Sequence, residues 1–431
     1  MSETLPTIRV NRKAAGRVSS GHPWIFSSDV VDRGAAQPGD VVRVVVEPKS
    51  PDRLSSRAKS RDLLLSHESQ PQGRAGGRFT TASGRFIGIA HYSSESQITL
   101  RMLSANYEPA DVAFFRGRLA AAIAHRESVV ENSEACRLVF SEGDLLPGLV
   151  VDRYGPYLTM QTLDQGMDRA RDTIVHCLKD LLAPGGILAR NDASVRKLEG
   201  LPLEVVTLAG EIPERVQVRM NGLNLEADLL RGQKTGIYLD QRENYVAAAR
   251  YLAAFQGSAR VLDCFTSTGG FALHLAKKAG SVDALDSSAP ALATAAANAR
   301  ANGITNVDFR QADVFEFLAS VSTNEGRRYS MVVLDPPAFA KSRKSLDDAA
   351  RGYKEINLRA LRLLGAGGLL VTCSCSHHMS EAMLLETIAE AALDAGKTLR
   401  VLERRTQAQD HPILLTVPET HYLKCLILQV V

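Results

Sequence analysis

The stretch VLDCFTSTGGFALHLAKKAG (261–280) decides the fold of the C-terminal half of this chain. An apolar run typical of a buried strand, VLDCF, ends in TSTGG and passes directly into an amphipathic helix. Small residues at such a turn let the backbone approach a ligand and expose the helix N-terminus. The turn lacks the G-x-G-x-x-G fingerprint of a dinucleotide site, which disfavours an NAD dehydrogenase. We therefore expect a ligand at the end of this strand, although the turn alone does not identify it.

Strands and helices alternate on both sides of this stretch. VQVRMNGLNLEADLL (216–230) predicts a hairpin with Asn221 and Gly222 at its turn, and a helix follows over 241–255. Strands are expected at ARVLDCF (259–265), SVDALD (281–286), VDFRQAD (307–313), YSMVVLD (329–335), GLLVTCSCS (368–376), LRVLERR (399–405) and YLKCLILQV (422–430). Such strands, separated by amphipathic helices, indicate a Rossmann-like α/β domain with a mostly parallel sheet covered on both faces. Ligands of such sheets bind at the carboxyl ends of the strands.

An N-terminal unit over 1–103 is predicted to be a small β-barrel. Short apolar runs at 7–47 and 78–103 are broken by Gly, Pro and Asp, as in strands joined by tight turns. The Ser-, Arg-, Gly- and Pro-rich segment 48–78 between them is predicted to be a disordered insertion. Its excess of basic residues suits RNA phosphates, but a solvated loop is the favoured interpretation.

A central α/β module is predicted over 104–215. The sequence favours a helix at 109–133, then three strands separated by turn residues, then a helix at 167–183 and a strand at 186–191. The C-terminal domain then extends over 216–431.

Acidic residues end four successive strands of the predicted sheet. A carboxylate at Asp286 suits two ribose hydroxyls, and one at Asp313 suits an adenine amino group. Asp263 ends the first strand, and Asp335 precedes two prolines that stiffen a loop ending at Phe339, where a flat base would fit. Any one of these acids is equally well explained as a strand-end residue or helix cap. Four at successive strand ends favour a ligand site.

Blocks throughout the sequence are similar to one family. They are GHPWIF (21–26), LPGLVVDRYG (146–155), KTGIYLDQREN (234–244), LDCFTSTGGFAL (262–273), LDPPAFAKSRK (334–344), RGYKEINLRALRLL (351–364) and TCSCSHHM (372–379). Through them the chain resembles the ribosomal large-subunit methyltransferase I family, the 23S rRNA cytosine-C5 methyltransferases, over nearly its whole length except the insertion. The resemblance implies a PUA barrel for RNA, a central α/β module and a Rossmann-like class I methyltransferase domain. It implies S-adenosylmethionine as cofactor, and 23S rRNA or an assembling large subunit as partner.

The resemblance also implies a cysteine nucleophile. Carbon 5 of cytosine becomes nucleophilic only when a thiolate adds to carbon 6, and covalent catalysis of this kind divides one hard step into two. Cys373 and Cys375 end a predicted strand, and their spacing puts both side chains on one face. The family pattern assigns the nucleophile to Cys375, with Cys373 in reserve and Asp335 at the cytosine edge. On residue type alone, two buried strand cysteines would be the favoured interpretation.

The base that removes the carbon-5 proton is not assigned. The loop Pro337-Ala338 lacks the second cysteine that many RNA cytosine-C5 enzymes carry after the paired prolines. His377 and His378 are close in sequence, but we expect them at the surface near a helix start.

The block 234–242 is implied to line the cofactor pocket. Tyr238 would pack on the cofactor and Arg242 would pair with its carboxylate, unless Arg242 only begins a helix and bridges to Glu243. The complete predicted cofactor set is Tyr238, Arg242, Asp263, Phe265, Thr268, Gly269, Asp286, Ser287, Asp313 and Asp335.

Basic residues beside an aromatic one in the barrel suit RNA phosphates and unstacked bases. We expect RNA contacts from these residues and a core position for Trp24. The predicted RNA-binding set is Arg12, Lys13, Arg17, His22 and Phe339.

Composition sets wider limits. The 431 residues carry a net charge of +3, which permits a nucleic-acid partner without requiring one. There is no apolar stretch of membrane-spanning length and no apolar signal core at the N-terminus, so we expect a cytoplasmic protein without a membrane partner. The six cysteines form no zinc-like spacing, so we expect reduced thiols and no metal.

Two other functions remain open at this stage. One is an RNA guanine-N methyltransferase of the same fold, which needs the Asp-Pro-Pro loop but no thiol. The other is a non-catalytic RNA-binding factor of ribosome assembly, because fold alone does not decide function. The sequence also leaves a homodimer open.

Overall fold

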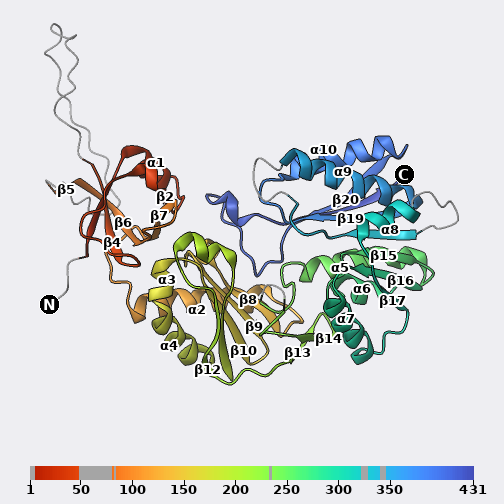
Figure 1. Ribbon diagram of the computed structural model, residues 1–431, viewed down its shortest axis with the longest axis horizontal. Helices are drawn as coiled ribbons and strands as arrows, with labels where there is room; N and C mark the ends of the chain where they lie inside the picture. The colour runs from red at the N-terminus through yellow and green to blue at the C-terminus, as the bar shows by residue number, and fades with distance from the viewer. Residues whose placement is uncertain (1–4, 48–79, 82–83, 233–234, 322–328, 340–345) are drawn as a thin grey trace, which may run out of the picture.

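The computed structural model describes residues 5–47, 80–81, 84–232, 235–321, 329–339 and 346–431 (Figure 1). The predicted insertion 48–78 therefore lies outside the described residues. No helix in the described ranges is long and apolar enough to cross a membrane.

The N-terminal sheet has seven strands in the order β2-β7-β6-β4-β1-β3, with β5 paired to β6. They are β1 (Thr7–Val10), β2 (Trp24–Phe26), β3 (Val30–Asp32), β4 (Val41–Val46), β5 (Thr80–Thr81), β6 (Gly84–Tyr92) and β7 (Ile98–Ser104). The expectation of strands alone is wrong here, because α1 (Arg12–Ser19) follows β1. The Asn11 side chain caps α1 by accepting from the Ala14 N–H at 2.9 Å, and the helix buries Ala14 and Ala15.

The central sheet has five strands in the order β12-β11-β10-β9-β8. They are β8 (Ala135–Phe140), β9 (Leu149–Tyr154), β10 (Tyr157–Thr162), β11 (Gly186–Asn191) and β12 (Glu204–Gly210). β10 and β11 are parallel, joined by α3 (Gln165–Arg169) and α4 (Arg171–Leu182), and α2 (Val112–Val129) packs on α4 and β8. The predicted helices and the strand at 186–191 are confirmed, except that the second helix is divided at Ala170.

A buried polar network joins the barrel to the central module. The Glu199 carboxylate accepts from Arg101 at 2.8 Å and from the Ser93 hydroxyl at 2.6 Å, and all three side chains are buried. Contacts of this kind fix the orientation of one sheet against the other.

The predicted hairpin is present as β13 (Val216–Met220) and β14 (Leu223–Ala227). Asn221 (φ +52°) and Gly222 (φ +72°) both have positive φ, as a two-residue type I′ turn requires. The hairpin packs on α7 (Ala289–Ala301) and leads into the C-terminal domain.

The C-terminal sheet has seven strands in the order β17-β16-β15-β18-β19-β21-β20. They are β15 (Arg260–Cys264), β16 (Ser281–Asp286), β17 (Val307–Gln311), β18 (Tyr329–Leu334), β19 (Leu364–Ser374), β20 (Leu399–Arg405) and β21 (Lys424–Val430). The first five are parallel, and β21 is antiparallel to both of its neighbours. The predicted Rossmann-like sheet is confirmed.

Helices cover both faces of this sheet (Figure 1). They are α5 (Arg242–Arg250), α6 (Gly270–Ala276), α7 (Ala289–Ala301), α8 (Val314–Val321), α9 (Leu346–Arg362) and α10 (Glu381–Asp394). Alternate strand residues divide between two cores: Val261 and Val333 pack with α5 and α6, whereas Leu262 and Val332 pack with α8 to α10. The strand order reverses between β15 and β18, and the crevice at their carboxyl ends is where ligands of such sheets bind.

Candidate active site

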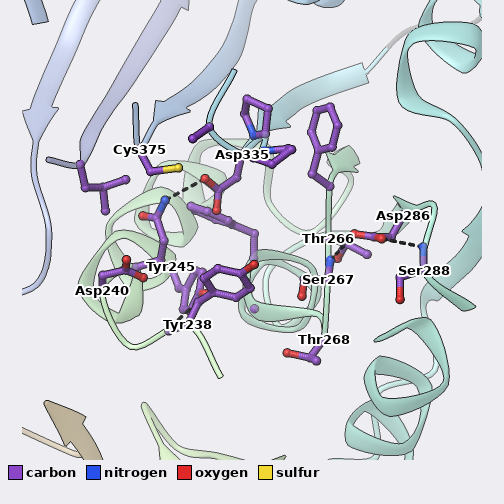
Figure 2. A pocket seen from close by; sticks show the side chains of 18 of the residues that line it. Tyr238, Asp240, Tyr245, Thr266, Ser267, Thr268, Asp286, Ser288, Asp335 and Cys375 are labelled. Carbon is purple, nitrogen blue, oxygen red and sulfur yellow. Dashed lines mark hydrogen bonds between the residues drawn. The ribbon is translucent and has the colours of Figure 1, made fainter. Parts of the chain in front are cut away.

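A cavity of about 440 Å³ opens at the carboxyl ends of β15, β16, β18 and β19 (Figure 2). Its wall combines aromatic rings, carboxylates and one thiol. The lining residues are Tyr238, Asp240, Gln241, Tyr245, Phe265, Thr266, Ser267, Thr268, Gly270, Phe271, Asp286, Ser287, Ser288, Asp335, Pro336, Pro337, Ala338, Cys375 and Leu423. Apolar walls with a few polar groups are typical of cofactor sites.

The loop after β15 is held in an uncommon conformation. Phe265 (φ +65°) and Ser267 (φ +50°) lie in the left-handed region, which costs a non-glycine residue about 1–3 kcal/mol. Two hydrogen bonds hold the loop: Thr266 Oγ1 donates to Asp263 at 2.6 Å, and Ser267 N donates to Asp286 at 2.9 Å. The loop therefore turns its backbone and the Phe265 and Thr268 side chains into the cavity.

Gly270 begins α6 against the ring of Tyr245. A Cβ atom at Gly270 would clash with Cζ and Oη of that ring. Tyr245 is itself fixed edge-on against Phe271, with ring centroids 4.8 Å apart, and its hydroxyl donates to the Tyr238 carbonyl at 3.4 Å. A side chain at position 270 would therefore displace the wall of the cavity.

Asp263 lies fully buried at the end of β15, beneath the loop. Its Oδ2 accepts from Thr266 and from the Ala272 N–H at 2.9 Å, whereas Oδ1 has no hydrogen-bond partner among the described residues. Burial raises the pKa of Asp263 to about 7, and the nearby Asp335 acts in the same direction, although the Thr266 hydrogen bond opposes both.

Asp286 and Asp313 have different positions. Asp286 lines the cavity, and its two oxygens accept from the backbone N–H groups of Ser267 and Ser288 at 2.9 and 2.8 Å. Asp313 is exposed, does not line this cavity, and caps α8 by accepting from Glu316 N at 3.0 Å. The helix-cap interpretation therefore fits Asp313, and its predicted adenine contact has no support from the cavity.

Asp335 projects into the cavity from the end of β18. Its Oδ1 accepts from the side-chain amide of Gln241 at 3.0 Å, and the Gln241 oxygen accepts from Asn244 at 2.6 Å. Tyr238 lies in the same wall, and its pKa is raised by burial and by the charge of Asp335. The carboxylate is thus oriented from one side while its other edge faces the cavity.

The two strand-end cysteines have separate environments. Cys375 lines the cavity, and Figure 2 shows its thiol pointing toward Asp335. Cys373 is fully buried in the core opposite Cys425, its partner residue in β21, and burial raises its pKa far above the ordinary value. Of the two thiols, only Cys375 lies in the cavity wall, so the buried-strand interpretation fits Cys373 alone.

The comparisons with known proteins agree with this geometry. A family model for S-adenosylmethionine-dependent methyltransferases matches residues 200–428, and one for PUA-like domains matches residues 8–51. A Shewanella denitrificans protein named ribosomal RNA large subunit methyltransferase I is 38% identical over 419 residues, 95% of each chain. The Vibrio cholerae protein of that name is 41% identical over 349 residues, 79% of this chain and 87% of the other.

The chain belongs to the ribosomal RNA large subunit methyltransferase I family. A crystal structure of a protein classed as a methyltransferase, complexed with SAH, matches 99% of this chain and 100% of that one with a TM-score of 0.78. At 19% identity this likeness shows the fold alone.

The cavity fits the S-adenosylmethionine that members of this methyltransferase family use. That cofactor joins a flat base, a ribose diol and a cationic amino-acid part. The cavity offers aromatic rings for the first and the Asp286 carboxylate for the second. Asp263 does not itself line the cavity, but its buried oxygen without a hydrogen-bond partner among the described residues lies beneath the loop and suits a cation. The absence of a Cβ at Gly270 leaves room for the Tyr245 ring in the cavity wall.

Arg242 does not line this cavity, so its predicted contact with the cofactor carboxylate is corrected. Its guanidinium is buried and lies 3.3 Å from Asp410 and 3.4 Å from Glu243, and α5 begins at Arg242 itself. Asp410 lies on the long loop between β20 and β21. Burial acts to raise its pKa, but His411 and Arg242 hold that pKa well below the ordinary value. The helix-start interpretation therefore fits Arg242.

Two further predicted residues, Gly269 and Phe339, also lie apart from the lining. Gly269 (φ +89°) caps α6 behind the loop, where a left-handed backbone favours glycine. Phe339 packs on Tyr353 and Phe315 with ring centroids 4.8 and 5.8 Å apart, so its predicted RNA contact is replaced by a core contact. His377 and His378 are exposed, as expected.

The predicted RNA-binding residues of the barrel fall into two groups. Arg12 and Lys13 are exposed on α1. Arg17 pairs with Asp29 at 2.8 Å, and His22 lies 3.2 Å from Glu419, so both already have acidic partners. Trp24 is half-buried and donates to Glu142 at 2.7 Å, so the core expectation holds only in part.

Several lining residues were missed by the sequence reasoning. Asp240 and Gln241 lie in the block 234–242, which offered a signal through its resemblance. Tyr245 and Leu423 offered none, because their approach to the cavity depends on packing between distant segments.

Proposed function

We propose that this chain methylates carbon 5 of a cytosine in 23S rRNA through a covalent bond between Cys375 and carbon 6. One observation carries the proposal: the Cys375 thiol lines the same cavity as Asp286 and Asp335. Its relatives at 38% and 41% identity bear the name ribosomal RNA large subunit methyltransferase I, which supports ribosomal RNA as substrate.

In this proposal the residues of the β15 and β16 ends hold the cofactor. Asp286 accepts from the ribose hydroxyls, Asp263 receives the ammonium group, and Phe265 and Thr268 line the base and sugar. Tyr238 and Ser287 complete the contacts from the cavity wall. When bound, S-adenosylmethionine supplies an electrophilic methyl group.

The thiol and Asp335 then act on the cytosine. The Cys375 thiolate forms a bond to carbon 6, and the electron pair of the carbon 5–carbon 6 bond becomes available at carbon 5. Asp335 stabilises protonated N3 at the cytosine edge, where negative charge would otherwise develop. Carbon 5 takes the methyl group as the bond between that group and the cofactor sulfur breaks, which leaves a neutral thioether. The carbon-5 proton then leaves to water, the carbon 5–carbon 6 double bond re-forms and the Cys375 thiolate is released.

We assign RNA binding to the N-terminal barrel. The PUA-like match at 8–51 supports this role, and Arg12 and Lys13 provide exposed positive charge. We place the domain boundaries after residues 103 and 215. The first falls one residue before the end of β7 (Ile98–Ser104), and the second falls just before β13 (Val216–Met220).

Bisulfite sequencing of 23S rRNA from cells with and without this protein tests the proposal. We expect one cytosine to lose its protection when the gene is deleted, and to regain it with the wild-type chain but not with Cys375→Ser. Cys373→Ala, in the buried core, is the matched control and should restore protection.

Other results would select the alternatives. Full activity of Cys375→Ser would refute covalent carbon-5 chemistry and favour methylation of a guanine nitrogen. Absence of S-adenosylmethionine binding in calorimetry would favour a non-catalytic assembly factor.

A further inference from the structure

A buried lysine lies behind the Cys375 turn. Lys424 begins β21, opposite Ser374 of β19, and only 3% of its surface is exposed. Its ammonium donates to the carbonyl oxygens of Ser376 at 2.7 Å and Tyr422 at 2.8 Å. Within the described part of the chain, it forms no ion pair with a carboxylate.

A buried ammonium held by two neutral carbonyls is costly, because charge leaves water without receiving an opposite charge. Burial accordingly lowers the pKa of Lys424 to about 8, whereas Cys375 and then Glu381 act to raise it. The lysine still keeps most of its charge at neutral pH. Cys375, the proposed nucleophile, is therefore the group that most favours the charged form of Lys424.

The same turn is held from its other side. Tyr353 of α9 accepts from the Ser374 hydroxyl at 2.9 Å and lies 3.2 Å from the Ser376 hydroxyl. With the Ser376 carbonyl fixed by Lys424, the residues on both sides of Cys375 are anchored. The turn thus presents the thiol to the cavity in one orientation.

The other groups near the thiol do not provide positive charge. Tyr238 and Tyr353 are neutral phenols whose pKa values are raised by burial, and Asp335 is acidic. His377 is partly exposed, but the remaining desolvation and then the charge of Lys424 lower its pKa, which disfavours the imidazolium form. Cys375 acts on the pKa values of Tyr238, Tyr353 and Lys424, and of these three groups Lys424 is the cation.

We infer that Lys424 is a positioning residue that anchors the Cys375 turn and supplies the positive charge that favours the Cys375 thiolate. The inference rests on the proposed role of Cys375 as nucleophile. Thiolates near lysine are a general means of obtaining a reactive cysteine at neutral pH.

The test measures the rate at which iodoacetamide alkylates Cys375 from pH 6 to pH 10, on the full chain without RNA. Peptide mass spectrometry resolves Cys375 from the other five cysteines, which are buried, and Cys375→Ser gives the blank. The variants are Lys424→Met and Lys424→Arg, with Lys278→Met, an exposed lysine in the turn after α6, as control.

We expect a wild-type midpoint below about 8.5, the ordinary cysteine value. Lys424→Met should raise it by about one pH unit, which lowers the thiolate fraction at pH 7 about tenfold. Lys424→Arg should keep most of the effect, and Lys278→Met should change nothing. An unchanged midpoint in folded Lys424→Met would overturn the inference. If that variant does not fold, a wild-type midpoint at or above 8.5 overturns it and a lower one supports it.

Failure of this inference can be distinguished from failure of the proposed function. A shifted midpoint with full methylation by Cys375→Ser would retain the charge effect and refute the nucleophile. An unshifted midpoint with inactive Cys375→Ser would refute the charge effect of Lys424 and retain Cys375 as the nucleophile.

Discussion

The side-chain amide of Gln241 donates a 3.0 Å hydrogen bond to the carboxylate of Asp335, 94 residues away. Gln241 ends the segment before α5, and Asp335 directly follows β18. The bond therefore connects the block that precedes the Rossmann-like sheet to the loop on which the proposed chemistry depends. It orients Asp335 without neutralising it.

Gln241→Glu should lower kcat/KM for methyl transfer at pH 7 by at least about tenfold. Two carboxylates about 3 Å apart cannot both ionise readily, so one pKa rises and the orientation of Asp335 is lost. Steady-state kinetics on an rRNA fragment measure the effect. Gln256→Glu adds the same charge at an exposed position away from the cavity and should leave kcat/KM unchanged. Equal activity of the two variants would show that this hydrogen bond does not matter.

Gly270→Ala should destabilise the protein by about 1–3 kcal/mol and weaken S-adenosylmethionine binding. The added methyl group clashes with the Tyr245 ring, which is packed between Phe271 and His274 and must move into the cavity or the core. Urea unfolding and calorimetry measure the two effects. Gly365→Ala is the matched control, because no atom lies within 4 Å of its added Cβ. A Gly270 variant that behaves like the Gly365 variant would contradict this account.

The parts of the fold that the sequence predicts are those with local causes. Alternation of apolar strands with amphipathic helices, and the Asn221-Gly222 turn, are set by residues a few positions apart. The same holds for the loop after β15, where small residues at the strand end indicated a ligand. The sequence did not predict the helix α1, because the segments on both sides of it are strand-like. Asn11 is a residue type that caps helices, and it caps this one.

The site features that the sequence could not predict depend on partners far apart in the chain. Arg242 pairs with Asp410 over 168 positions in the chain, so no spacing rule could have placed it. Lys424 approaches Cys375 only because β21 inserts antiparallel beside β19. Asp313 is the opposite case: its carboxylate has a local partner in the Glu316 N–H, and its position at a strand end does not bring it into the cavity wall.

Arg242→Met should cost about 3–5 kcal/mol of stability while leaving the S-adenosylmethionine Kd of the folded protein unchanged. Removing one partner leaves the buried Asp410 carboxylate with less compensation. Urea unfolding and calorimetry at low temperature separate the two. Arg250→Met removes an exposed pair with Glu403 and should cost less than about 1 kcal/mol. A large rise in Kd for folded Arg242→Met would restore its predicted cofactor role.

Alanine at both Arg12 and Lys13 should weaken binding to an rRNA fragment and reduce the slope of log K against log salt by about 1.4. Each phosphate contact on single-stranded RNA contributes about 0.7 to that slope. The matched double variant Lys278→Ala with Arg300→Ala removes two exposed charges from the C-terminal domain. If both pairs lower the slope equally, the charge acts through the whole molecule and α1 is not a specific contact.

Asp263→Asn should stabilise the cofactor-free protein at pH 8 and have little effect near pH 4. The folded pKa of about 7 exceeds the ordinary value of 3.8, so the folded state holds a proton that the unfolded state has released. The contribution of Asp263 to the free energy of unfolding is therefore fully present below pH 3.8 and is lost as pH rises to about 7. The loss has an upper limit of about 4 kcal/mol. Asparagine keeps an oxygen that accepts from Thr266 and Ala272 but carries no charge to bury.

Thermal unfolding from pH 4 to pH 8 should show the Tm values of the wild-type protein and Asp263→Asn diverging as pH rises. S-adenosylmethionine should bind the variant less tightly, because the Oδ1 proposed to receive its ammonium becomes a neutral amide group. A difference in Tm that stays constant across this pH range would contradict the assignment of a protonated Asp263.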